Sequence, residues 1–391
     1  MNSTQLGMIR IVDSAVNGKQ NILPADFDLN AAIKIARRHQ IVPMLYYGAL
    51  QCGISPKTPQ MQQLFVQTCQ YLAVNEKQML ELQRICAAFD EAQVEYMPLK
   101  GTLLKGMYPK PEMRPMSDAD ILIRVEQYGQ IKPIMERLGF EEQIESDHEL
   151  IWHKPQVHIE LHKRLIPSYN KDYYAYFGDG WRLAKPLQEQ PNRFAMTPED
   201  QLIYLFTHYA KHYRDAGIGI KHFVDLWIYR SKVALDEEYI HAELKKLKLD
   251  AFYDNTLRAL AVWFDEGQPD AVTELITETV FQSGVYGTHE GHLLSDAVKT
   301  AKAQKTAKRA RRKKILDTVF LPYKAMCERF PVVKKVPVLL PFMWVVRWAT
   351  ALFTRGRVGR RREELKTISV ERIDGYQQAL QTVGLDFNFK E

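Results

Sequence analysis

The chain has 391 residues and a formal net charge of +6, with 46% hydrophobic and 26% charged residues. This composition is typical of a folded protein and excludes a disordered chain, and the length favours more than one domain. The four cysteines are scattered without metal-ligand spacing, which indicates idle or buried thiols in a reducing compartment.

The N-terminal region, residues 1–90, is predicted to be helical. Its first twenty residues lack the basic and apolar segments of a signal peptide, so we expect a cytoplasmic protein. Apolar residues then recur every three or four positions over 27–90. Asp28 and Thr58 are predicted helix N-caps, and Pro59 follows at the first helical position.

The period changes in residues 91–170, which we predict to be a small α/β core. The segments 94–100, 118–125 and 157–163 are short and rich in aliphatic residues, as strands are. A helix ending near Gly139 lies between the second and the third. The predicted fold class is therefore α+β, a small mixed sheet flanked by helical regions.

Residues 171–298 are predicted to form a second helical domain. Thr197 as N-cap, Pro198 and Asp200 begin one helix, although Asp200 replaces the usual Glu or Gln of a capping box. Further helices are predicted at about 219–233, 236–247, 250–266 and 270–282.

The C-terminal region, residues 299–391, is basic and amphipathic. It has 22 Lys/Arg against 8 Asp/Glu, so the rest of the chain is mildly acidic. Nine of these cations lie in 299–314, and the apolar segment 330–353 is interrupted by three prolines and three cations. Trp344 and Trp348 would share one helix face, as interfacial anchors do.

This pattern suggests peripheral attachment through 299–353 to an anionic membrane on its inner face. A solvated helix face and core packing remain alternatives. The basic run lacks the interleaved aromatic residues of a single-strand binding site, so we do not expect a nucleic-acid partner.

Two acids stand at the start of the second predicted strand. Asp118 and Asp120 share one face because strand side chains alternate. Their repulsion would be relieved by a cation between them, and Mg²⁺ or Mn²⁺ prefers such oxygen ligands. Glu160 on the third strand could join them if the strands are neighbours, which would provide a metal site for phosphoryl or nucleotidyl transfer.

A phosphate-binding turn is predicted upstream of these acids. Gly101 would let the backbone approach a phosphate closely, and Thr102 begins a helix whose free N–H groups could bind it. Lys100, Lys105 and Arg114 are cations near this turn that could neutralise a triphosphate.

The segments "PLKGTLLKGMYPKPEMRPMSDADILI", "VHIELHKRL" and "THYAKHYRDAGIGIKHFVDLWIY" together resemble a family of uncharacterised nucleotidyltransferases. The family is part of the superfamily typified by DNA polymerase beta and is often associated with bacterial surface-polysaccharide gene clusters. The resemblance, over about 90–230, implies transfer of a nucleoside monophosphate from a nucleoside triphosphate to an acceptor hydroxyl. It implies that Asp118, Asp120 and Glu160 bind metal and catalyse.

The same resemblance implies that Gly101 and Thr102 form the phosphate turn, and it also extends to Lys100, Arg114, His208 and Asp225. One departure is that Lys100 stands where the superfamily usually has a small residue. The acceptor is not indicated by any part of the sequence.

Simpler interpretations exist for several of these residues. The acids could lie on a solvated strand edge, and His158 with His162 could form a zinc pair, although no Cys accompanies them. His208 could be a core histidine, and Asp225 is expected to be buried and paired, with His208 or Lys221 as partner. At the level of function, the alternatives are a non-catalytic accessory protein of a polysaccharide system and a nucleic-acid-binding module.

Overall fold

A computed structural model describes residues 1–285, 287–303, 316, 319–352 and 369–385 of the chain. Contacts divide these residues into two compact units. The first comprises the described residues of 1–211 and 218–285, and the second those of 212–217 and 287–385. The first unit contains the sheet and every predicted site residue.

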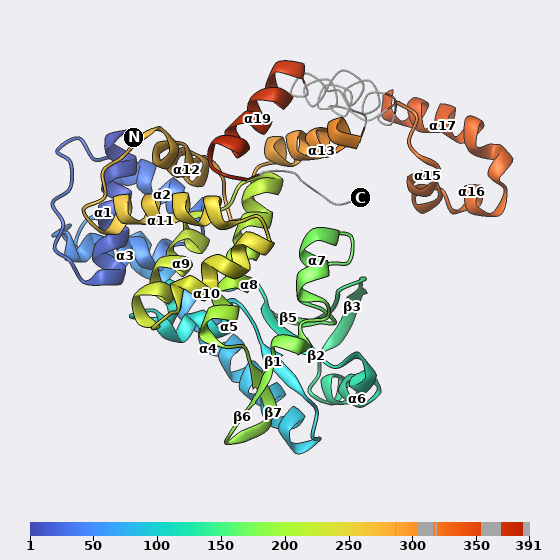
Figure 1. Ribbon diagram of the computed structural model, residues 1–391, viewed down its shortest axis with the longest axis horizontal. Coiled ribbons are helices and arrows are strands. Elements are labelled where there is room, and N and C mark those ends of the chain that lie inside the picture. The colour runs from blue at the N-terminus through green and yellow to red at the C-terminus, as the bar shows by residue number, and fades with distance from the viewer. Residues whose placement is uncertain (286, 304–315, 317–318, 353–368, 386–391) are drawn as a thin grey trace. The chain divides into compact units, whose positions relative to one another are not determined.

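Four helices form the N-terminal part of the first unit (Figure 1). The predicted caps are confirmed: Asp28 accepts from the Asn30 N–H at 2.8 Å, and Thr58 accepts from the Met61 N–H at 3.3 Å. The first helix falls within residues 1–90, the region predicted to be helical, although its own bounds were not predicted. The four helices are α1 (Ser3–Asn17), α2 (Leu29–Arg38), α3 (Val42–Gln51) and α4 (Pro59–Glu91).

A mixed seven-stranded sheet follows, in the order β3-β4-β5-β2-β1-β7-β6. The predicted α+β class is thus confirmed. The three predicted strands correspond to β1, β2 and β5, whereas β3, β4, β6 and β7 were not predicted. The strands are β1 (Tyr96–Pro98), β2 (Ala119–Ile123), β3 (Glu141–Glu145), β4 (Glu149–Lys154), β5 (Val157–His162), β6 (Lys185–Leu187) and β7 (Gln190–Ala195).

Short helical segments connect the first strands. The turn after β1 leads into the short helix α5 (Gly101–Leu104) and two 3-10 turns, η1 (Lys105–Met107) and η2 (Pro111–Met113). After β2 come η3 (Val125–Gln127) and α6 (Tyr128–Arg137), which agrees with the predicted helix ending before Gly139.

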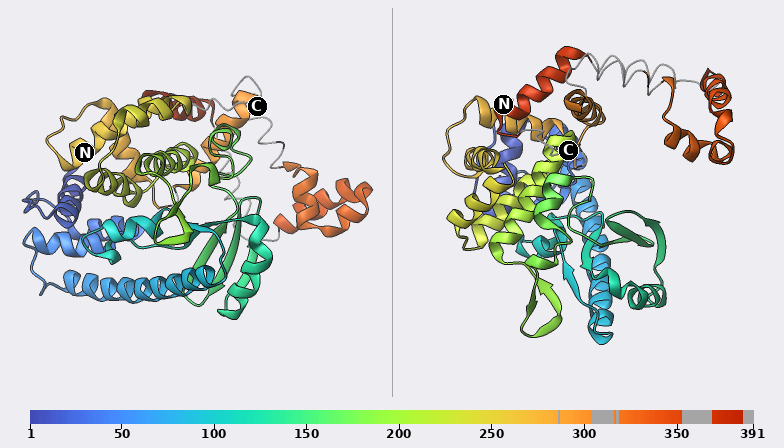
Figure 2. Two further views of the ribbon diagram at one scale, coloured as in Figure 1. Left: turned by 60° about the horizontal axis from the view of Figure 1, so that its bottom comes forward. Right: turned by 45° about the vertical axis from the view of Figure 1, so that its right-hand side comes forward.

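The two faces of the sheet differ because side chains alternate along each strand. Ile121 on β2 and Ile159 on β5 are fully buried in a core with Ile85 and Phe89 of α4 and Ile131 of α6. Figure 2 shows the long helix α4 running along the sheet with α6 beside it. The other face of β2 and β5 therefore carries the polar residues.

Further helices complete the first unit. The predicted start of α8 is confirmed, since the Asp200 N–H donates to Thr197 Oγ1 at 3.2 Å. The four later helices lie close to their predicted ranges. The segments are α7 (Lys171–Phe177), η4 (Trp181–Leu183), α8 (Pro198–Ala216, whose last turn belongs to the second unit), α9 (Ile220–Lys232), α10 (Glu237–Lys246), α11 (Asp250–Phe264) and α12 (Ala271–Gln282).

The second unit is helical in its described part. Trp344 and Trp348 donate their indole N–H groups to the carbonyls of Leu321 and Val319, and both rings contact Phe320. Among the described residues, no helix is long and apolar enough to span a bilayer. The helical segments are α13 (His289–Ala303), α15 (Tyr323–Arg329), α16 (Pro331–Lys335), η5 (Pro337–Leu339), α17 (Leu340–Leu352) and α19 (Val370–Thr382).

Most of the predicted basic run, from residue 304 onward, lies outside the described residues.

Candidate functional site

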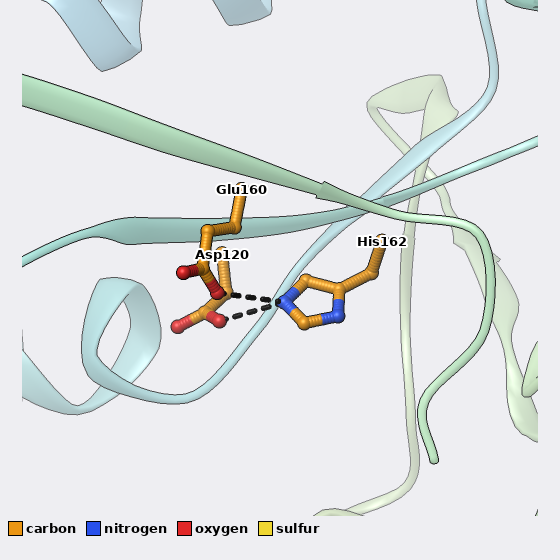
Figure 3. Close-up of side chains that lie close together, drawn as sticks. All are labelled: Asp120, Glu160 and His162. Carbon is orange, nitrogen blue, oxygen red and sulfur yellow. Dashed lines mark hydrogen bonds and ion pairs between the residues drawn. The ribbon is translucent and has the colours of Figure 1, made fainter. Parts of the chain in front are cut away.

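Two acids from neighbouring strands meet on the polar face of the sheet. β2 and β5 are parallel, and their register places Asp120 directly beside Glu160. His162, two residues further on β5, points to the same place, and Figure 3 shows the three side chains converging. One ligand atom from each lies within 4.8 Å of the others, which is close enough for a shared metal ion.

Asp120 is buried, and its Oδ1 atom receives two hydrogen bonds. Lys100 Nζ lies 2.6 Å and His162 Nε2 lies 2.8 Å from this oxygen. Burial alone would raise the pKa of Asp120, but the nearby Lys100 charge and His162 outweigh it and hold that pKa well below its usual value. Asp120 is therefore ionised at neutral pH.

The same contacts also shift the pKa values of Lys100 and His162. Burial lowers the pKa of Lys100, but the Asp120 charge more than compensates, so that the pKa is raised overall. For His162, burial and the Lys100 charge lower the pKa, and hydrogen bonds to Asp120 and Glu160 raise it above the ordinary value. Lys100 is accordingly a cation within the site.

Lys100 occupies an unusual backbone conformation, with φ 45° and ψ −121° between β1 and α5. This is a region that glycine enters far more readily than lysine. In this conformation the Lys100 ammonium forms its ion pair with Asp120.

Asp118 lies next to this group and differs from Asp120 in its charge state. Burial raises the pKa of Asp118 to about 7, and the charges of Asp120 and Glu160 act in the same direction. Lys100 and Lys221 partly oppose the shift. Asp118 lies just before β2 and Asp120 lies on it, and two neighbouring acids with divergent pKa values are typical of functional sites.

Three buried polar atoms around the acids have no hydrogen-bond partner in the described part of the chain. They are Thr102 Oγ1, His162 Nδ1 and Tyr204 Oη. Tyr204, from α8, lies within electrostatic range of Lys100, Asp120 and Glu160. Buried polar groups are normally satisfied, so these atoms are available to hydrogen-bond a bound ligand.

The donor set fits a divalent cation. Two carboxylates and an imidazole suit Mn²⁺, and the carboxylates alone suit Mg²⁺ with water completing its shell. The alternative of a zinc pair from His158 and His162 is not supported, because His158 Nδ1 lies 3.3 Å from His153 Nδ1 and is not in the cluster.

Arg114 and Asp225 form a separate buried ion pair. Arg114 Nε lies 2.7 Å from Asp225 Oδ1, and Tyr108 donates its hydroxyl to the same oxygen at 2.6 Å. Asp225 is thus buried and paired, as expected, but its partner is Arg114 instead of His208 or Lys221. Loss of one member of such a pair typically costs about 3–5 kcal/mol, so a structural role follows.

The remaining predicted residues are more dispersed. A Cβ on Gly101 would approach Met116 and Arg114 Nη1 to 3.1 and 3.3 Å, so this position has little room. Lys105 is buried and donates to Asn75 Oδ1 on α4. His208 is half-buried on α8, four residues after Tyr204 and therefore on the same helix face.

Tyr204 is a member of the site that the sequence did not indicate, and His162 was expected beside the site but not among its ligands. His162 carried a usable signal, since it shares a strand face with Glu160 at spacing i, i+2. Tyr204 is an aromatic in an amphipathic helix, and nothing in its local sequence separates it from a core residue.

Comparisons with known proteins give one family. A family model described as "Uncharacterised nucleotidyltransferase" matches residues 25–265. No curated protein matches the chain. A solution structure of the antibiotic-resistance factor ANT(2'')-Ia is 15% identical and covers 48% of this chain and 97% of its own, with a TM-score of 0.32. That likeness is too low to support an inference.

Proposed function

Because the chain belongs to the family of uncharacterised nucleotidyltransferases, we propose that it transfers a nucleoside monophosphate from a nucleoside triphosphate to an acceptor hydroxyl. Family membership indicates a transferase. The observation that carries the proposal is the side-by-side placement of Asp120 and Glu160 on parallel strands, with Asp118 adjacent. We assign this chemistry to the predicted core, residues 91–170.

Asp120, Glu160 and His162, which form the cluster, would hold Mg²⁺ or Mn²⁺. Asp118 lies outside that cluster but within electrostatic range of Asp120 and Glu160, and we propose it as a fourth ligand. When bound, the ion neutralises charge that builds up on the phosphate oxygens. Asp118 would bind in its ionised form, because a nearby cation favours the carboxylate.

The turn at 100–102 is proposed to hold the triphosphate. Lys100 supplies a positive charge beside the acids, and the buried Thr102 hydroxyl is available as a donor. The closely packed Gly101 would let the phosphates approach the backbone. The phenolic hydroxyl of Tyr204 is a further donor without a partner in the described residues.

In the transfer step, the acceptor oxygen forms a bond to the α-phosphorus, and the bond to the oxygen bridging to the β-phosphorus breaks. Pyrophosphate leaves, and the proton of the acceptor hydroxyl passes to a base. We propose Glu160 as this base, because it is only partly buried and stands beside Asp120.

The test is a labelling screen. Full-length protein is incubated with cell extract, Mg²⁺ or Mn²⁺, and each nucleoside triphosphate labelled either at the α- or at the γ-phosphate. Transfer of the α-label alone supports nucleotidyl transfer. Transfer of the γ-label would identify a kinase instead and refute the proposal.

A second proposal concerns the C-terminal region. We propose that residues 299–353 attach the enzyme peripherally to an anionic membrane on its cytoplasmic face, in keeping with a role in surface-polysaccharide synthesis. Three exposed apolar side chains support this proposal. Val338 is 87%, Phe342 63% and Val345 54% exposed to solvent. Trp344 and Trp348, expected as anchors, are engaged by Phe320, so the exposed residues take that role.

A further inference from the structure

A cavity of about 430 Å³ lies in the first unit and is lined in part by Pro115, Met116 and Ser117, the residues that lead into Asp118. Its wall also includes residues of α2 and α4. The volume falls within the usual range for small-molecule sites. Five of its lining side chains are amides, Gln40, Gln67, Gln70, Asn75 and Gln78.

Lys105 and Arg37 bring positive charge to this cavity, and none of its described lining residues is an acid. Lys105 lines it and is buried, and its ammonium donates to the neutral amide oxygen of Asn75. Lys221, also buried, lies 3.5 Å from Gln40 Oε1 and 3.3 Å from the Pro115 carbonyl, both part of the lining. Within the described ranges, neither ammonium forms an ion pair with a carboxylate. Arg37 adds an exposed guanidinium.

Buried cations without counterions are costly, and proteins normally pair them. Burial, helped by the Arg114 charge, lowers the pKa of Lys105 to about 8 and that of Lys221 to about 7. Nearby acids oppose these shifts only in part, Glu112 and Glu76 for Lys105 and Asp225 and Asp118 for Lys221. An anion in the cavity would offset the cost of burying these charges. The surrounding amides can both donate to and accept from a polar ligand body.

We infer that this cavity binds the acceptor and that the acceptor is a small phosphorylated molecule. The inference rests on the proposed function. In-line displacement places the attacking hydroxyl and the leaving pyrophosphate on opposite sides of the reacting phosphorus, so the acceptor must approach from the side away from the pyrophosphate. With the triphosphate at the 100–102 turn, the cavity beside Ser117 is left for the acceptor.

This inference gives Lys105 a different role from the one expected from the sequence. From the sequence it is expected to contact the triphosphate, but it lines the cavity and bonds to α4. Its charge would hold the acceptor phosphate through a charge-assisted hydrogen bond. Arg37 would add a second, weaker contact from the exposed side.

The first measurement uses inorganic phosphate as the probe, followed by ³¹P NMR in metal-free buffer with full-length protein. Phosphate should bind, and Lys105→Met should weaken binding by about tenfold or more, with Arg37→Gln giving a smaller loss. Lys57→Met, which removes an exposed lysine, is the matched control and should change nothing.

The second measurement separates this site from the nucleotide site. Binding of each nucleoside triphosphate with Mg²⁺ should be unchanged in Lys105→Met and Arg37→Gln, whereas label transfer to the acceptor in extract should fall by about tenfold in Lys105→Met. Asp120→Asn should show the opposite binding pattern, keeping phosphate and losing nucleotide.

Three results would overturn the inference: no phosphate binding by the wild-type chain at millimolar concentration, a parallel loss of nucleotide and phosphate binding in Lys105→Met, or full label transfer by Lys105→Met. If Asp120→Asn keeps nucleotide binding while Lys105→Met loses phosphate alone, the proposed metal site fails and the cavity still stands as a phosphate site.

Discussion

Asp120 on β2 and Glu160 on β5 lie directly opposite each other in the parallel register of two neighbouring strands. Asp120 is buried and held by Lys100 and His162, whereas Glu160 is more exposed. The pair thus combines a fixed acid and a more accessible one, which fits separate roles in binding and proton transfer.

Replacing Glu160 tests the role of the accessible acid. Glu160→Gln should lower kcat by about 10²–10⁴-fold and weaken nucleotide binding much less, because a base acts on the acceptor hydroxyl and not on the triphosphate. Steady-state kinetics together with calorimetry of nucleotide binding separates the two. An equal loss of both would reduce Glu160 to metal retention, and wild-type kinetics would remove it from the site.

The backbone at Lys100 gives a stability prediction. Lys100→Gly and Lys100→Met both remove the ion pair with Asp120, but only glycine relaxes the conformation at φ 45°. Glycine relieves the backbone strain, but it also raises the conformational entropy of the unfolded chain, which offsets part of this gain. The glycine variant should therefore be more stable than the methionine variant by about 1 kcal/mol. Urea denaturation of the two variants measures this difference. A glycine variant no more stable than the methionine variant would show that the backbone at residue 100 is unstrained.

Buried His39 predicts a loss of stability in acid. Burial, assisted by the Arg38 charge, lowers its pKa from 6.5 to about 4. Its Nδ1 accepts from the Ile220 N–H at 3.2 Å, so the folded protein holds the neutral ring. The unfolded chain therefore takes up the proton first, and stability should fall as the pH drops from about 6.5 to about 4.

The lowered pKa of His39 should reduce the free energy of unfolding by about 3 kcal/mol over this pH range. Denaturation midpoints across this pH range should show a flatter slope in His39→Gln than in the wild type. Identical slopes would mean that His39 is already protonated in the folded protein.

If the protein attaches to a membrane as proposed, replacing two exposed side chains on α17 should weaken its binding to vesicles. Full-length protein should sediment with vesicles containing acidic lipid, and both high salt and Phe342→Ser with Val345→Ser should reduce this. Phe65→Ser with Val66→Ser, on α4, removes equally exposed apolar residues and serves as the control. Protein that stays in the supernatant at low salt, or an equal effect of the control, would contradict the attachment.

The helical parts of the fold and the position of the acids were predictable because both depend on local patterns. Caps at Asp28, Thr58 and Thr197 follow from short-range chemistry. The i, i+2 spacing of Asp118 and Asp120 predicted a shared strand face. In the structure only Asp120 is on β2, and Asp118 lies in the bend just before it.

Two of the unpredicted strands lack such patterns. β3 reads Glu-Glu-Gln-Ile-Glu, a sequence with little strand preference, and β6 is three residues long with a central proline. They form because neighbouring strands offer hydrogen bonds, and that depends on the assembled sheet.

Contacts between residues far apart in the chain could also not be predicted from the sequence. Arg114 and Asp225 are 111 residues apart, and the Lys105–Asn75 contact joins two separate helical segments. The residue type predicts that a buried acid needs a cation, but which of several cations it meets is set by tertiary packing. The same holds for Tyr204, which reaches the site only through the position of α8.

The most direct test of the metal site is Mn²⁺ binding followed by EPR in the presence of each nucleoside triphosphate. The wild-type chain should bind Mn²⁺ with its nucleotide, and Asp120→Asn should weaken this by at least about tenfold, because it removes the one acid held ionised by Lys100 and His162. Glu126→Gln, an exposed carboxylate just after β2, should bind as the wild type does. Unchanged Mn²⁺ and nucleotide binding in Asp120→Asn would contradict a metal site on β2 and β5.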